Sequence, residues 1–192
     1  MTAATVRVQI PDSLVWLAQQ PTRVKIAVGG RGSGKSTGVA DLMLGFAAAG
    51  DKVLATREFQ NSIDDSVHAM MSSEVERLGL GDSFQVMANE IRTDAGGEVF
   101  YRGLARNITS LKSLAGVNKL FVEEAESVSE RSLKVLTPSI RSAAGSDSAP
   151  ELWFVMNRGS RTDAVAQKYL ARAEPELAKS GRYSDDLVSV VE

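Results

Sequence analysis

The segment that most constrains the fold is the run VKIAVGGRGSGKSTG at residues 24–38. It joins an apolar stretch to a cluster of glycines and then to a predicted helix. Glycine loses more conformational freedom on folding than other residues, so such a cluster indicates that a ligand approaches the main chain closely. Gly29-x-x-x-x-Gly34-Lys35-Ser36 fits the P-loop pattern, in which backbone N–H groups and a helix N-terminus hold phosphate oxygens. The pattern therefore predicts a nucleotide site.

The surroundings of the loop agree with this interpretation. Residues 24–28 predict a short buried strand before it, and Gly50 is a natural end for the helix after it. The apolar residues of that helix recur at helical spacing: Val39, Leu42, Met43 and Phe46. In the pattern Lys35 reaches the outer phosphates and the Ser36 hydroxyl binds Mg²⁺. A glycine-rich turn that matches by chance is the alternative, and the correct order of strand, loop and helix argues against it.

The composition limits the classes of protein. A chain of 192 residues has room for one well-buried domain, and its 22 basic and 24 acidic residues leave it nearly neutral. Any contact with DNA must then be local, or come from another part of a larger assembly. The chain has no cysteine, which excludes disulfides and thiolate metal sites.

Two further features exclude other sites. No apolar run approaches the roughly 18 residues needed to cross a bilayer, and the N-terminus lacks a secretion signal, so we expect a cytosolic protein without membrane contact. His68 is the only histidine. Because it lies near Asp64 and Asp65 on a predicted helix, we interpret it as a solvated surface residue rather than a ligand.

Strand-like and helix-like segments alternate, which predicts an α/β fold with a mainly parallel central sheet and helices on both faces. After the P-loop helix we expect central strands at 52–57, 119–124 and 151–157, and a last strand-like run at 187–191. The predicted helices cover 61–80, 129–140 and 162–173. Short antiparallel strands are expected at 84–88, 90–94 and 96–103, and a loop or short helix at 104–118.

Two successive acids complete the nucleotide site. The run KLFVEEAE places Glu123 and Glu124 at the carboxyl end of a predicted strand, where ligands bind in open α/β sheets. We assign Glu123 to the Mg²⁺ shell, partly through water, and Glu124 to deprotonating an attacking water. This pair favours hydrolysis over transfer to a substrate. The alternative is an acidic helix N-terminus, in which Glu123, Glu124 and Glu126 complement the helix dipole.

An arginine is expected near the γ-phosphate, where negative charge spreads in the transition state. Arg31 lies inside the loop and is the candidate in cis. The candidates for action in trans, from a neighbouring subunit, are Arg102, Arg106 and Lys112. Asn157 is the last residue of the strand predicted at 151–157 and is a candidate γ-phosphate sensor, with an ordinary turn residue as the alternative.

The adenine pocket is less well marked. Arg57 and Gln60 follow the strand at 52–57, and Trp16, Gln19 and Gln20 precede the first strand. Stacking and amide hydrogen bonds from these side chains suit a purine, although exposed polar residues explain most of them equally well. The strand-like run LVSVV ends at the chain terminus without a stop signal, so we expect one domain of a longer protein, with a frayed terminus as the alternative.

Three segments together carry a family resemblance. GGRGSGKS, ATREFQNSIDDSV and SLKSLAGVNKLFVEEAE resemble, in order and spacing, the ATPase domain of the large terminase subunit of tailed bacteriophages. The resemblance runs from about residue 22 to 192. It implies a P-loop NTPase of the additional-strand, conserved-glutamate (ASCE) type, with Glu123 and Glu124 as Walker B acid and catalytic glutamate. Asn157 would lie in the coupling motif and Arg57 near adenine. The Walker A residues would be Gly30, Arg31, Gly32, Ser33, Gly34, Lys35, Ser36 and Thr37.

The resemblance also implies a role. Residues 1–192 would be the N-terminal motor domain, using ATP and Mg²⁺ to move double-stranded DNA into a procapsid in the cytoplasm of an infected bacterial host. Its partners would be the portal protein, the small terminase subunit and further copies in a pentameric ring, although the isolated chain could be a monomer. The family's RNase H-like nuclease domain is not visible, so we expect no DNA cleavage.

Two departures from the family pattern concern the site. Glu123 stands where aspartate is commoner, and MNRGS replaces the expected Asn-Pro after the coupling strand, which puts the role of Asn157 in doubt. Other interpretations remain open. A helicase-like motor would separate a forked duplex, an ATP-binding assembly switch would scarcely turn ATP over, and a small-molecule kinase would pass phosphate to an acceptor.

Overall fold

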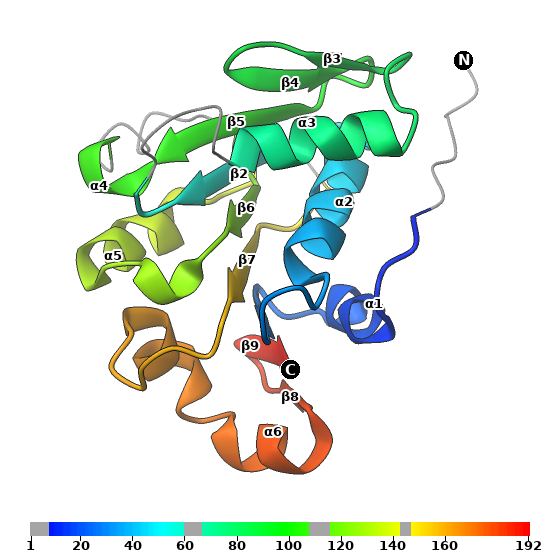
Figure 1. The fold of residues 1–192 in the computed structure, drawn as a ribbon. Helices are drawn as coiled ribbons and strands as arrows, with labels where there is room; N and C mark the ends of the chain where they lie inside the picture. Colours follow the sequence, from blue (N-terminus) through cyan, green and yellow to red (C-terminus); the bar gives the residue numbers. More distant parts are fainter. Residues whose placement is uncertain (1–7, 60–66, 108–115, 143–146) are drawn as a thin grey trace.

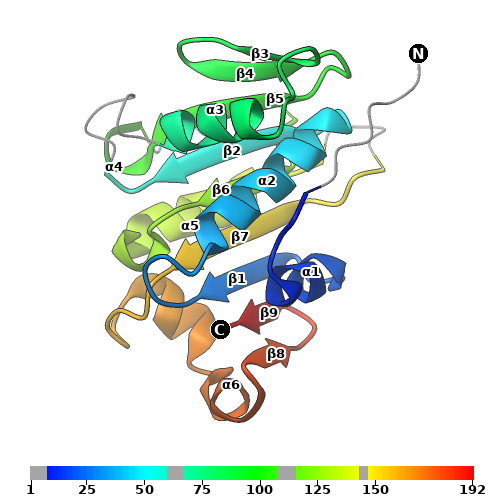
Figure 2. The same cartoon turned by 45° about the vertical axis from the view of Figure 1, so that its right-hand side comes forward.

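The computed structural model describes residues 8–59, 67–107, 116–142 and 147–192. In this part of the chain a single sheet holds nine strands in the order β3-β4-β5-β2-β6-β7-β1-β9-β8 (Figures 1 and 2). The strands are β1 (Val24–Val28), β2 (Lys52–Arg57), β3 (Phe84–Val86), β4 (Glu90–Thr93), β5 (Glu98–Gly103), β6 (Lys119–Val122), β7 (Glu151–Met156), β8 (Arg182–Ser184) and β9 (Val188–Val191).

The centre of the sheet is parallel. β5, β2, β6, β7, β1 and β9 pair with one another in parallel, whereas β3, β4 and β8 add antiparallel strands at the two edges. The expectation that residues 96–103 belong only to an antiparallel group was wrong. β5 is antiparallel to β4 on one side and parallel to β2 on the other, because Val99 and Tyr101 are buried in the main core.

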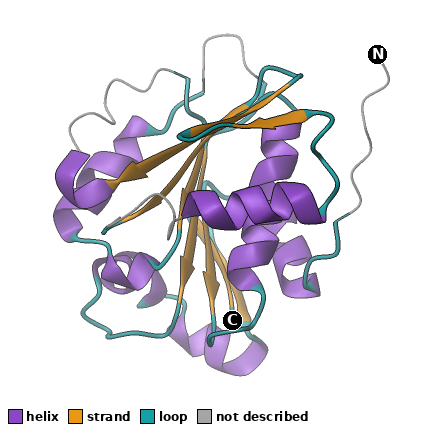
Figure 3. Cartoon of the chain, turned by 45° about the horizontal axis from the view of Figure 1, so that its top comes forward, coloured by secondary structure: helices purple, strands orange, loops and turns teal. Residues whose placement is uncertain are grey.

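Helices cover both faces of the sheet (Figure 3). They are α1 (Asp12–Gln19), α2 (Lys35–Ala48), α3 (Val67–Arg77), α4 (Leu104–Asn107), the 3₁₀ turn η2 (Ala125–Ser127), α5 (Glu130–Ser139), the π-helical turn η3 (Ala166–Leu170) and α6 (Glu174–Ser180). Sequence patterns did not predict α1, α6 or β8. Part of the helix expected at 61–80 and part of the loop at 104–118 lie outside the described residues. The helix expected over 162–173 is represented by η3 with the short turns around it.

Alternation along the strands produces two cores. In β1, Val24, Ile26 and Val28 face the core beneath α5 and η3, while Ala27 faces the core beneath α1, α2 and α3. A strand buried on both faces reads as a continuous apolar run, as residues 24–28 do. Among the described helices, none has the length and apolar character to cross a membrane.

An ion cluster connects α2 and α3 beside the second core, where the Arg77 side chain is half exposed. Asp41 on α2 is buried and accepts a hydrogen bond of 2.6 Å from Arg77, which also donates to Glu74 at 2.5 Å. Burial and a hydrogen bond with Glu74 raise the pKa of Asp41 from 3.8 to about 6, against the opposing effect of Arg77. The folded state therefore holds this proton more tightly than the unfolded state, and stability falls as the pH rises through this interval.

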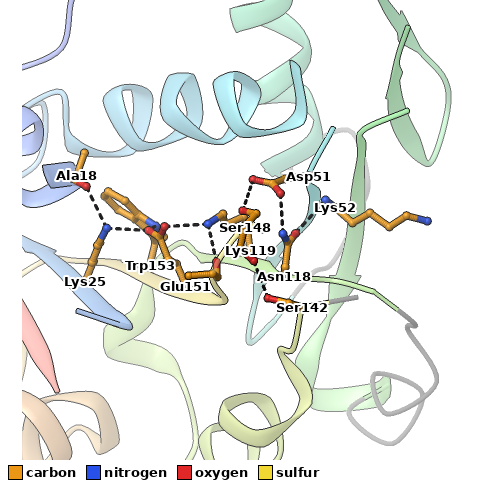
Figure 4. A network of polar contacts seen from close by, with 11 residues as sticks. Ala18, Lys25, Asp51, Lys52, Asn118, Lys119, Ser142, Ser148, Glu151 and Trp153 are labelled. Carbon is orange, nitrogen blue, oxygen red and sulfur yellow. Dashed lines mark hydrogen bonds and ion pairs between the residues drawn. The ribbon is translucent and has the colours of Figure 1, made fainter. Parts of the chain in front are cut away.

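A second buried network lies at the amino ends of the strands (Figure 4). Lys25 on β1 and Lys119 on β6, 3% and 2% exposed, each lie 2.8 Å from a carboxylate oxygen of Glu151 on β7. Burial opposes ionisation of Glu151, but the two ammonium groups outweigh it and lower its pKa. Trp153 donates to the same carboxylate at 2.9 Å. The network fixes the relative register of three strands whose opposite ends carry the candidate site.

His68 differs from its sequence interpretation. Its side chain is half-buried, its ring packs edge-on against Tyr101 at 4.7 Å between centroids, and its Nε2 atom lies 2.8 Å from the Met87 carbonyl oxygen. The interpretation as a solvated surface residue was therefore wrong, because the turn after β3 and strand β5 supply partners that the local sequence does not show.

Candidate active site

The glycine-rich loop lies at the carboxyl end of β1 and leads into α2 (Figure 2). Gly32 and Gly34 adopt φ angles of 75° and 78°, a left-handed conformation that glycine reaches without a Cβ clash. Gly34 is the N-cap of α2, so the first N–H groups of the helix face the loop. Backbone donors and the positive end of the helix dipole are therefore directed toward an anion.

Lys35 is held by two acceptors at the mouth of this loop. Its ammonium group donates to the Gly30 carbonyl at 2.8 Å and to the Asn157 Oδ1 atom at 3.0 Å. An ammonium group has three donors, so one proton remains for a further acceptor. Asn157 directly follows β7, and the structure thus brings two residues together that sequence reasoning assigned to separate roles.

Ser36 connects the loop to the acidic pair. Its hydroxyl donates to Glu123 Oε1 at 3.2 Å. Glu123 follows β6, which is separated from β1 by β7. The strand inserted between the loop strand and the acid strand is the feature that defines the additional-strand fold, and it confirms the predicted fold class.

The acidic pair follows β6 as predicted, although the strand ends at Val122 rather than at residue 124. Glu123 is buried, whereas the Glu124 side chain is 55% exposed. Glu124 has φ 54° and ψ 45° and is the single non-glycine residue with positive φ in the described ranges. This backbone conformation carries strain for a residue with a Cβ.

Arg57 lies against this pair instead of standing apart from it. Its guanidinium forms a close ion pair with Glu123 Oε2, and its terminal nitrogen lies 3.9 Å from Glu124 Oε1. The guanidinium thereby offsets repulsion between the adjacent carboxylates. The expected contact of Arg57 with adenine stays a prediction, and Gln60, its expected partner there, lies outside the described residues.

Glu126 is the site residue that sequence reasoning missed. Its two carboxylate oxygens accept hydrogen bonds from Asn157, one from the side-chain Nδ2 atom at 3.0 Å and one from the backbone N–H at 3.1 Å. The signal was present, because EEAE contains a third acid. It was interpreted only as part of an acidic helix start.

These side chains surround a pocket of about 440 Å³. Its lining consists of Arg31, Gly32, Lys35, Ser36, Glu123, Glu124, Glu126, Val155, Met156 and Asn157. The hydroxyl of Ser36 and the carboxylate of Glu123 are hard oxygen donors that suit Mg²⁺. In the described ranges no group of three or more His, Cys, Asp or Glu side chains forms a metal site. Mg²⁺ commonly takes its remaining ligands from phosphate and water, so the donor set fits.

The other predicted residues lie around or away from this pocket. Arg102 is at the end of β5, where it donates to the Tyr101 carbonyl at 2.7 Å. Lys112 and the side chain of Arg106 lie outside the described residues. The central guanidinium carbon of Arg182 lies 5.5 Å from the centre of the Trp16 ring on α1. The Trp16 carbonyl accepts a hydrogen bond from the Gln20 side chain.

A second hollow, of about 330 Å³, borders the other side of the loop. It lies between the loop, the start of α1 and the end of β9, and Pro11, Ser13 and Leu14 form its wall opposite the glycines. Neither Trp16 nor Gln19 is among its lining residues. Arg57, on the acid pair, does not border it either.

Comparison with known proteins decides the family. A family model described as phage terminase large subunit matches residues 21–190. The chain belongs to the phage terminase large subunit family. This confirms the resemblance carried by the three sequence segments. None of the curated proteins matches the chain.

Solved terminase structures share the fold. The N-terminal domain of the DNA packaging ATPase from bacteriophage phi29 aligns with a TM-score of 0.67 at 14% identity, over 88% of this chain and 89% of that domain. The large terminase from a thermophilic bacteriophage aligns with a TM-score of 0.65 at 13% identity, over 94% of this chain and 43% of its own length. The large terminase of bacteriophage HK97 aligns with a TM-score of 0.67 at 13% identity, over 86% of this chain and 36% of its own length. This chain therefore spans less than half the length of the last two large terminases.

Proposed function

We propose that this terminase chain is a Mg²⁺-dependent ATPase domain that drives double-stranded DNA into a procapsid. The observation that carries the proposal is the contact between Ser36 and Glu123 across β7, with Glu124 beside it in the same pocket. It joins the phosphate-binding loop to a carboxylate pair, which is the arrangement that ATP hydrolysis requires. The large terminase from the thermophilic bacteriophage was crystallised with ATP-gamma-S and with ADP, which supports nucleotide binding in the family.

The loop residues bind and orient the nucleotide. Backbone N–H groups from Gly29 to Thr37 would surround the phosphates, and Lys35 would direct its free proton at the outer phosphates. Mg²⁺, when bound, would neutralise charge on the phosphates and would be held by Ser36 and, through water, by Glu123. The Ser36 hydroxyl and the Glu123 carboxylate already lie 3.2 Å apart, so little rearrangement is needed.

Glu124 is the proposed base for the attacking water. Its side chain is 55% exposed and lines the pocket, and its backbone has the left-handed conformation. Arg31 lines the same pocket and is the proposed cis arginine for the charge on the γ-phosphoryl group. The trans candidates Arg102, Arg106 and Lys112 would act only on a neighbouring subunit.

The assembly also belongs to the proposal. We infer that residues 1–192 act as the ATPase domain of a ring, a pentamer on the portal protein, with the small terminase subunit as a further partner. The work would take place in the cytoplasm of the infected bacterium.

Phosphate release tests the hydrolytic part. The purified chain should release free phosphate from ATP only when Mg²⁺ is present, and Ser36→Ala should raise the Mg²⁺ concentration needed for half the maximal rate. Ser73→Ala, an exposed change on α3, is the matched control. ATP binding without phosphate release would favour an assembly switch, and phosphate transferred to an acceptor would favour a kinase.

A second assay separates the packaging motor from a helicase-like motor. Addition of portal-bearing procapsids should increase the rate of phosphate release. Strand separation of a forked duplex in the presence of ATP would contradict the packaging role and support the helicase interpretation.

A further inference from the structure

The Asn157 side chain bridges the P-loop lysine and a third acid. Its Oδ1 atom accepts from Lys35 at 3.0 Å, while its Nδ2 atom donates to Glu126 Oε1 at 3.0 Å. Lysine can only donate, and an ionised carboxylate can only accept. The amide therefore has one orientation that satisfies both neighbours, with its oxygen toward Lys35 and its nitrogen toward Glu126.

Glu126 fixes this orientation at two points. Its second oxygen accepts from the backbone N–H of Asn157 at 3.1 Å, so the carboxylate holds both the main chain and the side chain of that residue. If the amide turned over, its NH₂ group would face the Lys35 ammonium and its oxygen would face the carboxylate. Both contacts would then be repulsive.

Glu126 also lies between two hollows. It lines the nucleotide pocket and a neighbouring hollow of about 550 Å³ formed by the start of α5 and residues 162–168. The segment after β7 passes close to it, because a Cβ atom at Gly159 would be 3.3 Å from the Glu126 Cβ atom. The acid is thus packed against the chain that leaves the site, and its position does not depend on the side chain of Asn157 alone.

We propose that Glu126 is a positioning residue for ATP hydrolysis that acts through Asn157 on Lys35. The Gly30 carbonyl and the Asn157 oxygen hold two donors of the ammonium group, and the third stays directed at the pocket. Glu126 maintains the second of these bonds by fixing the amide. The inference rests on the proposed function, since Lys35 must contact the nucleotide phosphates.

Glu126→Gln is the sharpest variant, because it keeps the volume but replaces one acceptor by a donor. We expect it to weaken binding of ATP-gamma-S with Mg²⁺ about tenfold, the order expected for one hydrogen bond to a charged group, and to lower the hydrolysis rate. Glu126→Asp keeps two acceptors and should bind more tightly than Glu126→Gln. Glu130→Gln removes an acid whose partner is Lys134 and should leave both quantities unchanged.

A double-variant cycle distinguishes positioning from a purely structural effect. If Glu126 acts through Asn157, the double variant Glu126→Gln/Asn157→Ala should bind ATP-gamma-S no more weakly than Asn157→Ala alone. Urea unfolding should show that each single variant is folded under the conditions of the binding assay, so that lost affinity reports the site and not unfolding. Affinity for ATP-gamma-S in Glu126→Gln within twofold of the wild type, or full additivity in the double variant, would overturn the inference.

Nucleotide affinity and phosphate release test this inference and the proposed function separately. Nucleotide affinity measured by calorimetry tests the positioning role whether or not hydrolysis occurs. A wild-type chain that binds ATP-gamma-S, shows the predicted cycle and releases no phosphate would support the positioning role while contradicting the ATPase proposal.

Discussion

The left-handed backbone at Glu124 predicts a reversal of the usual order of alanine and glycine. With φ 54° and ψ 45°, a Cβ atom at this residue lies close to the following carbonyl oxygen, at a cost of roughly 1–2 kcal/mol. Glycine avoids that cost but loses about 0.5–1 kcal/mol through its greater freedom in the unfolded chain. Glu124→Gly should therefore be more stable than Glu124→Ala by about 0.5–1 kcal/mol.

Both variants lack the carboxylate, so the exposed contact with Arg57 at 3.9 Å is lost in each and cancels in the comparison. Ser73 in α3 supplies the matched control because it is exposed and lies within a helix. There, glycine should be less stable than alanine by about 1 kcal/mol. The stability of the glycine variant relative to the alanine variant should then differ between residues 124 and 73 by roughly 1.5–2 kcal/mol. Urea unfolding at neutral pH resolves this difference.

Activity completes this test. Neither Glu124 variant should hydrolyse ATP, although Glu124→Gly is the more stable of the two, so lost activity cannot be ascribed to unfolding. If the alanine variant at residue 124 is as stable as the glycine variant, the argument that backbone strain is stored at Glu124 is refuted.

Further predictions concern the acid pair and the core. Arg57→Ala should raise the Mg²⁺ requirement of hydrolysis about 10–100-fold, measured by Mg²⁺ titration, because Glu123 loses its ion pair. Asp41→Asn should abolish the fall in stability between about pH 4 and pH 6, and it should stabilise the chain at pH 7. Urea unfolding at each pH measures both effects. If the variant is less stable than the wild type at pH 7, the ion pair with Arg77 outweighs the cost of burying Asp41. Gly97→Ala should destabilise the chain by about 1–3 kcal/mol or more, since its Cβ would lie 1.9 Å from a carbonyl oxygen of α2. By contrast, Gly45→Ala, with open space around it, should stabilise α2 by about 1 kcal/mol, and equal thermal midpoints for these two glycine variants would contradict both estimates.

The parts of the fold that the sequence predicted are those with strong local signals. The P-loop and the apolar runs of β1, β2, β6 and β7 mark strands that are buried on both faces, and their parallel arrangement follows from the helices between them. The position of Glu123 and Glu124 at a strand end followed from the same rule. These features depend on a few adjacent residues, which explains why they could be read directly.

The features that were missed depend on contacts between distant segments. The partial burial of His68 comes from Met87 and Tyr101, and the parallel partner of β5 is β2, which is distant in the sequence but adjacent in the sheet. The ion pair between Arg57 and Glu123 joins positions 66 residues apart, so no local pattern marked it. Glu126 acquires its role only when β7 brings Asn157 beside it.

The measurement that tests the central claim most directly is the rate of phosphate release by the wild type, Glu124→Gln and Arg31→Ala over a wide range of protein concentration. The account predicts Mg²⁺-dependent release by the wild type and loss of that release in Glu124→Gln, with ATP still bound. If one subunit holds the whole site, the rate per molecule should not change with concentration, and Arg31→Ala should also be inactive. Glu124→Gln with the wild-type rate would contradict the assignment of the catalytic acid and, with it, the proposed mechanism.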